Sequence, residues 1–105
     1  MSDILNALQS TIRERHSADP ARSYVAKLQA GGVSNIARKL GEEAVETIIA
    51  ALSADDAALT SEAADLVFHL LVLLDGRDIA FADVEAELVR REGVSGLTEK
   101  ASRTE

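Results

Sequence analysis

The sequence predicts an all-α fold of about five helices, forming a single domain over residues 1–105. Apolar residues recur at helical spacing in five segments, and no stretch alternates with a period of two as a half-buried strand would. Only one proline and six glycines interrupt the chain. A length of 105 residues is close to the usual size of one domain. Because aromatic residues make up only 3% of the chain, leucine, isoleucine, valine and alanine must form the core.

The five expected helices each combine an apolar stripe with start or stop signals. Their expected ranges are 4–16, 24–30, 34–53, 60–75 and 81–92. Asp3, Ser23 and Thr60 are the expected N-terminal capping residues. Glycines at Gly31-Gly32 and Gly76 are expected to end the second and fourth helices. The expected buried stripe of the last helix consists of Phe81, Val84, Leu88 and Val89.

The expected helix over residues 34–53 has a wide apolar arc. At 100° per residue, its apolar side chains cover roughly 220°. A helix on one side of a small monomer needs about half of that, so the arc predicts burial against its own chain and against a second subunit. Gly41 lies mid-helix, where glycine costs about 1 kcal/mol relative to alanine. Its presence there indicates the close approach of another backbone or a ligand.

The entire net charge of −7 lies between Glu42 and Asp65. This stretch holds seven acidic residues and no lysine or arginine, whereas eleven acids balance eleven bases elsewhere. The charge excludes a nucleic-acid partner, which would need a basic face. The absence of cysteine excludes disulfides and thiolate metal sites. The N-terminus carries no export signal, and the longest apolar run is too short to span a bilayer, so no membrane partner and a cytoplasmic location are expected.

The acidic residues fall on matching sides of two apolar helices. Glu42, Glu43 and Glu46 share one sector of the third helix. On the fourth, Glu62, Asp65 and His69 fall within about 60° of one another. Two unit charges about 5 Å apart repel by about 3 kcal/mol at an effective dielectric constant of 20. A divalent cation would relieve that repulsion at neutral pH.

The ligand types indicate which cation and substrate to expect. Oxygen donors favour Mg²⁺, with Mn²⁺ as an alternative, over Zn²⁺. Mg²⁺ usually binds one or two carboxylates together with waters and substrate phosphates. The sequence therefore predicts a phosphate ester as substrate, with Lys27 and Lys39 as its phosphate-binding residues.

Each motif by itself also has a structural explanation. A Glu-Glu-x-x-Glu run is common on solvated helix faces. Glu62 and Asp65 could be first-turn acids that respond to the helix dipole, and a lone histidine such as His69 is more often a hydrogen-bonded core residue than a ligand. However, Asp65 and His69 lie in an otherwise apolar segment, where a purely structural helix has little reason to carry a carboxylate.

The combined motif resembles a known enzyme family. Glu43-x-x-Glu46, followed after fifteen residues by Glu62-x-x-Asp65, resembles the metal signature of the all-α, MazG-like nucleoside triphosphate pyrophosphohydrolases. A finer resemblance, to the phosphoribosyl-ATP pyrophosphatase family, covers nearly the whole chain. It rests on Ser23-Tyr24 and on residues 36–46, 62–72 and 95–100.

This resemblance implies a reaction, a cofactor and an assembly. The reaction is hydrolysis of 1-(5-phosphoribosyl)-ATP to phosphoribosyl-AMP and pyrophosphate, the second step of histidine biosynthesis, in a Mg²⁺-dependent homodimeric helical bundle. The implied metal ligands are Glu43, Glu46, Glu62 and Asp65. Glu42, or whichever carboxylate is left off the metal, is expected to activate the attacking water, and Glu46 is also expected to be essential for turnover. The expected phosphate contacts are Ser23, Lys27 and Lys39. His69 is expected to support Asp65.

Two other functions stay open at this point. One is an enzyme of the same superfamily that hydrolyses dUTP or noncanonical nucleoside triphosphates. The other is a catalytically silent helical dimerisation module whose acidic residues form a solvated face.

Overall fold

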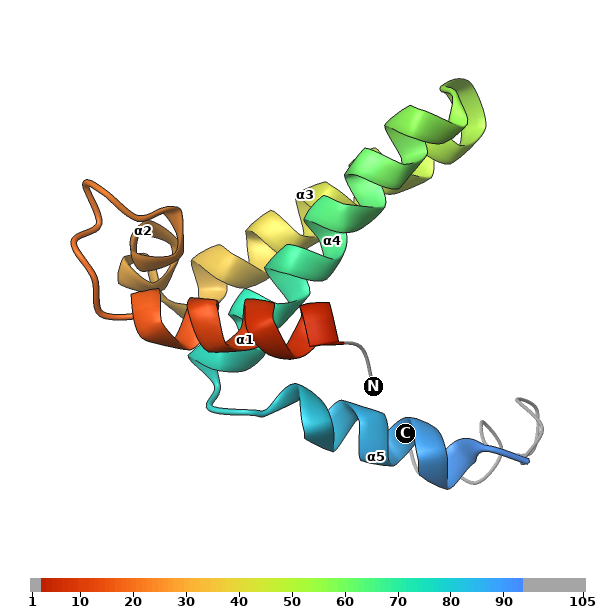
Figure 1. The fold of residues 1–105 in the computed structure, drawn as a ribbon. Helices are drawn as coiled ribbons and strands as arrows, with labels where there is room; N and C mark the ends of the chain where they lie inside the picture. Colours follow the sequence, from red (N-terminus) through yellow and green to blue (C-terminus); the bar gives the residue numbers. More distant parts are fainter. Residues whose placement is uncertain (1–2, 94–105) are drawn as a thin grey trace.

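The computed structural model describes residues 3–93, which form five helices (Figure 1). They are α1 (Asp3–Arg15), α2 (Tyr24–Ala30), α3 (Gly32–Ser53), α4 (Asp56–Gly76) and α5 (Phe81–Arg91). No strand occurs between residues 3 and 93. The predicted all-α class with five helices is therefore confirmed. The motif at residues 95–100 lies outside the described part of the chain.

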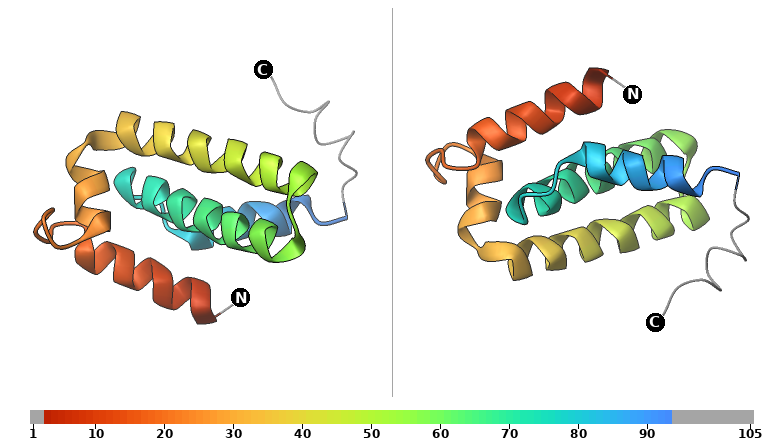
Figure 2. Two further views of the ribbon diagram at one scale, coloured as in Figure 1. Left: turned by 90° about the horizontal axis from the view of Figure 1, so that it is seen from above. Right: turned by 90° about the horizontal axis from the view of Figure 1, so that it is seen from below.

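The long helices α3 and α4 pair as an antiparallel hairpin that organises the fold. Their mutual packing is the most extensive between any two elements, and α4 also packs against α1 and α2. In Figure 2, α4 runs between α3 and α1, and the hairpin tip projects beyond the other helices in Figure 1. The core lies at the opposite end of the hairpin, where four helices meet; it consists of Ile12, Val25, Leu28, Ile36, Leu71 and Val72.

Two predicted N-terminal caps, Thr60 and Asp3, were wrong. Helix α4 begins at Asp56 because Asp55, rather than Thr60, is the cap: its carboxylate accepts a hydrogen bond from the Ala58 N–H at 2.8 Å. The Thr60 hydroxyl instead donates to the Asp56 carbonyl inside the helix. Asp3 is itself the first helical residue of α1.

The glycine pair between α2 and α3 behaves differently from the expectation. Gly31 has a right-handed conformation with φ of −79°. Of these two glycines, only Gly32, with φ of +83°, occupies the left-handed region that favours glycine. Helix α3 begins directly at Gly32, so the chain turns from one helix into the next with almost no loop.

The predicted buried stripe of α5 is only half correct. Phe81 and Val84 are partly buried, but Leu88 and Val89 are 59% and 67% exposed. Helix α5 is attached mainly at its start, where the Phe81 N–H donates to the Gln9 side chain and the Phe81 ring packs against the core. The amphipathic pattern of α5 predicted a buried face, but no other part of residues 3–93 buries Leu88 and Val89.

Helix α4 is long and apolar enough to cross a membrane, judged by length and composition alone. The central helix of a helical bundle can have the same length and composition. Here α4 packs against three other helices and carries Glu62, Asp65 and Asp75 along its length. Its C-terminal half contributes Leu71 and Val72 to the core that these helices share.

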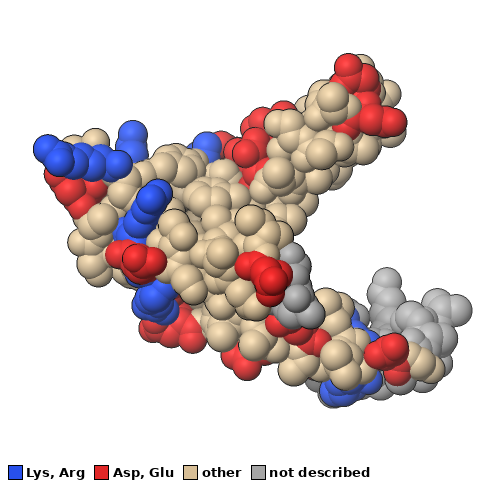
Figure 3. Space-filling view, viewed as in Figure 1, with Lys and Arg blue, Asp and Glu red and all other residues tan. Residues whose placement is uncertain are grey.

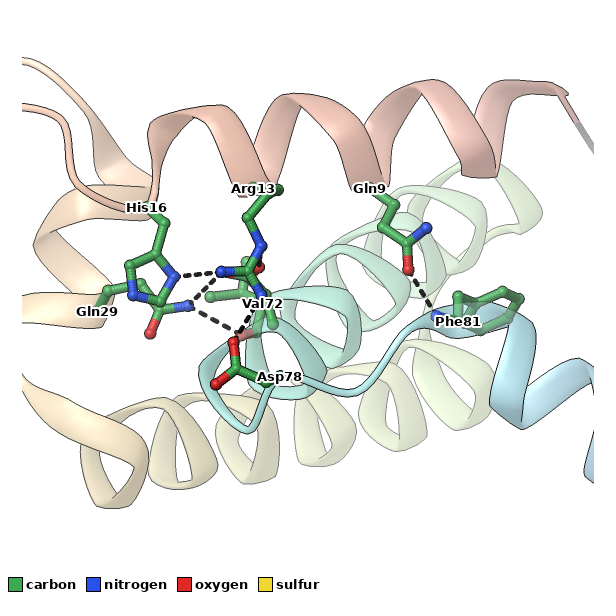
Figure 4. A network of polar contacts seen from close by, with 8 residues as sticks. Gln9, Arg13, His16, Gln29, Val72, Asp78 and Phe81 are labelled. Atoms are coloured by element: carbon green, nitrogen blue, oxygen red, sulfur yellow. Dashed lines mark hydrogen bonds and ion pairs between the residues drawn. The ribbon is translucent and has the colours of Figure 1, made fainter.

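A polar network that the sequence did not predict fixes α1 to the C-terminal end of α4 (Figure 4). Its centre is Asp75, which is only 6% exposed. Arg13 Nε lies 2.9 Å from one carboxylate oxygen, and His16 Nδ1 lies 2.5 Å from the other. The Gln29 amide donates both to Asp75 and to the Val72 carbonyl. Residues of α1, of the turn that follows it and of α2 thereby satisfy one buried acid of α4.

Candidate functional site

Three carboxylates from α3 and α4 converge along the hairpin. One oxygen each from Glu43, Glu62 and Asp65 lie within 4.8 Å of one another. Glu43 is 8% exposed, Glu62 is partly buried and Asp65 is exposed. The cluster therefore begins inside the helix interface and opens to the surface. The structure brings together three of the four predicted metal ligands.

Glu43 supplies the test of whether this cluster fits a cation. Its Oε2 atom is buried and has no hydrogen-bond partner. Leaving a buried acceptor unsatisfied costs about 1–3 kcal/mol, and more if it is charged. Buried charges in proteins are normally paired or coordinate metals. A cation held between Glu43, Glu62 and Asp65 would satisfy this atom, so the donor set fits a metal ion that prefers oxygen ligands.

The fourth predicted ligand, Glu46, lies outside this group of three but close enough to affect it. The pKa of Glu62 is raised, first by burial and then by the negative charges of Glu46, Asp65 and Glu43. Glu46 is exposed on α3, one turn beyond Glu43. Its carboxylate therefore borders the cluster from the solvent side.

Glu42 is held by two cations of its own helix. Its carboxylate pairs with Arg38 and with Lys39, whose Nζ lies 3.4 Å from Glu42 Oε1. Burial is the largest influence on the pKa of Glu42 and raises it, but the hydrogen bonds and charges of Lys39 and Arg38 together outweigh burial and lower the pKa. A carboxyl group with a lowered pKa is a weak proton acceptor.

His69 is buried and bridges α4 to α2. Its Nδ1 lies 2.7 Å from the Asp65 carbonyl, and its Nε2 lies 2.9 Å from the Tyr24 hydroxyl. A carbonyl only accepts, so Nδ1 carries the proton and Nε2 accepts from Tyr24. With both nitrogens engaged, His69 supports the main chain of Asp65 and is not arranged as a metal ligand.

The predicted phosphate contacts fall in two places. Ser23 and Lys27 line a shallow depression on α2 and the loop before it, together with Pro20, Ala21, Arg22 and Tyr24. The Ser23 oxygen caps α2 by accepting from the Ala26 N–H at 3.2 Å. Lys39 lies on α3, and its pKa is raised first by Tyr24 and then by Glu42. Figure 3 shows lysine and arginine gathered at the end of the molecule that carries α2.

A second hollow, of about 380 Å³, lies away from the acidic cluster. It is formed between α1, the end of α4 and the chain before α5, and its polar lining includes Gln9, Ser10, Arg13 and Asp78. Arg13 is already paired with Asp75 and Asp78. The charged groups of this hollow therefore serve the α1–α4 contact and leave the acidic cluster as the better candidate site.

Comparison with known proteins identifies the family. The family profile described as phosphoribosyl-ATP pyrophosphohydrolase matches residues 5–92, which include every candidate site residue above. The chain belongs to this family. The resemblance seen in the sequence motifs is thereby confirmed, and the family is one of hydrolases.

Several relatives align with this chain over nearly their full length. Phosphoribosyl-ATP pyrophosphatase of Novosphingobium aromaticivorans is 59% identical over 102 residues, covering 97% of this chain and 95% of the relative. The protein of the same name from Rhizorhabdus wittichii is 60% identical over 103 residues, covering 98% and 97%. That from Dinoroseobacter shibae is 58% identical over 100 residues, covering 95% and 98%.

Two residues near the site were not singled out as functional from the sequence. Tyr24 is 48% exposed, and its hydroxyl is bonded to His69. Arg22 shares the depression with Lys27. A signal was available for Tyr24, because it follows the cap Ser23 in one of the segments that resemble the family.

Proposed function

We propose that this chain hydrolyses 1-(5-phosphoribosyl)-ATP to 1-(5-phosphoribosyl)-AMP and pyrophosphate, the second step of histidine biosynthesis, in the cytoplasm. The structural observation that carries the proposal is the buried, unpartnered Oε2 of Glu43 beside two further carboxylates. The near full-length relatives named phosphoribosyl-ATP pyrophosphatase support the choice of substrate.

The proposed cofactor is Mg²⁺, with Mn²⁺ as an alternative. Glu43, Glu62 and Asp65 would hold it, because their oxygens share one small space and hard divalent cations prefer such ligands. Glu46 adds a fourth negative charge at the rim. When bound, the ion polarises phosphoryl oxygens and offsets the charge that develops on the leaving pyrophosphate.

Glu46 is the proposed general base. It is the one acid of the predicted set that borders the cluster without belonging to the group of three and without a cation partner like those of Glu42. It would orient the attacking water and take its proton while the water oxygen bonds to phosphorus and the bond between the α and β phosphoryl groups breaks. Glu42 would instead hold Lys39 in place, next to the phosphates.

The remaining chain supplies contacts for the substrate. Lys39 is partly buried beside Glu42 and Tyr24, where its ammonium group can face a phosphoryl oxygen. Lys27 and Ser23 line the depression on α2, where the Ser23 hydroxyl can donate to a phosphate while its oxygen caps the helix. These groups would bind the polyphosphate and the phosphoribosyl phosphate.

A homodimer is proposed because α3 presents a second apolar face. Val45, Ile48, Ile49 and Leu52 are 55%, 59%, 56% and 83% exposed. They follow the i, i+3, i+4, i+7 spacing of a helix-packing stripe. Gly41 lies on the same side one turn earlier, and nothing lies within 4 Å of the position its Cβ would take. A helix of a second copy could therefore approach α3 closely along this stripe.

Replacement of Glu46 by alanine tests the proposed chemistry. We expect pyrophosphate release from phosphoribosyl-ATP to fall by at least about 100-fold, within the range of general-base contributions, with an unchanged helical circular dichroism spectrum. Glu14→Ala, an exposed change on α1, is the matched control. Loss of helical structure in Glu46→Ala would show that Glu46 has a structural role. Full activity of the wild-type protein with dUTP, but none with phosphoribosyl-ATP, would assign the chain to another substrate.

A further inference from the structure

We propose that Tyr24 is the platform on which the purine ring of the substrate stacks, and that it selects an adenine substituted at N1 over ordinary adenine. This inference rests on the proposed function and names the residue that recognises the base. Tyr24 is 48% exposed, although the next two residues, Val25 and Ala26, are buried. An aromatic ring this exposed at the border of the site needs an explanation other than core packing.

The ring is held rigidly from behind and at its edge. Phe68 stacks against it, with a centroid distance of 6.1 Å and an interplanar angle of 17°. The hydroxyl is bonded to His69, and the His69 ring meets Tyr24 edge-on at 5.7 Å. A ring that is already fixed loses little conformational entropy when a ligand stacks on its open side.

The position of Tyr24 fits a base whose phosphates reach the acidic cluster. His69, which holds the Tyr24 hydroxyl, lies one turn of α4 beyond Asp65, a rise of roughly 5–6 Å. Lys39 is close enough to both Tyr24 and Glu43 for each to raise its pKa. His69 therefore connects the aromatic ring to the α4 turn that carries Asp65, and Lys39, which pairs with Glu42, lies beside them.

The chemistry of the proposed substrate explains why an aromatic ring suits this place. An adenine with a carbon substituent at N1 takes up a proton and is cationic near neutral pH, whereas ordinary adenine is neutral. The face of a tyrosine ring attracts cations, in addition to the stacking that any base offers. Tyr24 would thus favour phosphoribosyl-ATP, whose adenine is cationic, over ATP, whose adenine is neutral.

The composition of the chain provides a direct probe. Tyr24 is the single tyrosine and there is no tryptophan, so tyrosine fluorescence reports on this ring alone. We expect 1-methyladenosine 5′-monophosphate to change that fluorescence saturably, and at lower concentration than AMP. An unchanged emission at concentrations that inhibit pyrophosphate release, or an equal response to AMP, would overturn the proposal.

Substitutions separate the ring from the hydroxyl. Base–aromatic stacking is worth 1–3 kcal/mol, so Tyr24→Leu should raise KM for phosphoribosyl-ATP by about 5-fold to 150-fold with kcat much less affected. Tyr24→Phe, which keeps the ring, should raise KM much less than Tyr24→Leu, and the control Phe81→Leu at the start of α5 should stay near the wild type. An unchanged KM in Tyr24→Leu, or equal losses in the leucine and phenylalanine variants, would refute the stacking role. A wild-type protein that releases no pyrophosphate would refute the proposed function instead, and the fluorescence titration would still test the platform.

Discussion

Replacing Glu43 by glutamine should stabilise the protein when no divalent cation is present. Glu43 is 8% exposed, its Oε2 has no partner, and one of its oxygens lies within 4.8 Å of oxygens of Glu62 and Asp65. Glutamine removes the charge and offers N–H donors to the neighbouring carboxylates. An unsatisfied buried acceptor costs about 1–3 kcal/mol, so the variant should gain roughly that amount. For a domain of this size, each kcal/mol raises Tm by about 4–8 °C.

Thermal unfolding followed by circular dichroism, in EDTA and then in excess Mg²⁺, measures this effect. A ligand at 100 times its Kd stabilises the folded protein by about 2.7 kcal/mol. The wild type should therefore gain Tm when Mg²⁺ is added, and Glu43→Gln should gain little. Glu14→Gln, an exposed change on α1, controls for the substitution itself. A Glu43→Gln variant that is less stable than the wild type in EDTA would refute the view that this cluster is strained without a cation.

Three further predictions follow from other parts of the molecule. Asp75→Asn should lower the free energy of unfolding in urea by about 1–3 kcal/mol because it weakens a buried network, whereas Asp78→Asn, at an 81% exposed side chain, should change it little; equal effects would contradict this assignment. Hydrogen bonds from Arg90 and Arg91 lower the pKa of Glu87 from 4.5 to about 2. The ionised Glu87 carboxylate therefore stabilises the folded protein above pH 4.5, and this stabilisation is lost as the pH falls toward 2. The Tm difference between the wild type and Glu87→Gln should shrink over that interval, and a difference that persists would contradict this. Ile49→Asp should convert the proposed dimer to monomer in analytical ultracentrifugation, and an unchanged sedimentation coefficient would exclude this face of α3 as the interface.

The helices could be predicted because each carries a clear periodic pattern. The wide apolar arc of α3 also proved informative, since one part packs within the chain around Ile36 and Ala50 while another part, including Ile48 and Leu52, is exposed. Helix ends were less certain, because Asp55 and Thr60 are both good capping residues and only the packing of the hairpin decides between them.

The candidate site could be predicted in part for a similar reason. A helical wheel places Glu62, Asp65 and His69 on one side of α4, but it does not show what covers each turn. Glu62 and Asp65 face α3 and join Glu43, whereas His69 lies one turn further on, where α2 covers it with Tyr24.

The Asp75 network lay beyond any pattern in the sequence. Its partners Arg13, His16 and Gln29 are 46 or more residues away along the chain. Such contacts depend on how α1 and α2 dock on α4, which local periodicity does not specify. The burial of Leu88 and Val89 on α5 was wrongly predicted, because an apolar stripe predicts burial but does not show which surface would cover it.

The most direct measurement is pyrophosphate release from phosphoribosyl-ATP, with Mg²⁺ added to protein first stripped of metal by EDTA. The carboxylate site on α3 and α4 predicts no release without the cation and a saturable rise as Mg²⁺ is added. Release at the full rate without a divalent cation, or no release at any Mg²⁺ concentration, would contradict the assignment of Glu43, Glu62 and Asp65 as the metal site of a phosphoribosyl-ATP hydrolase.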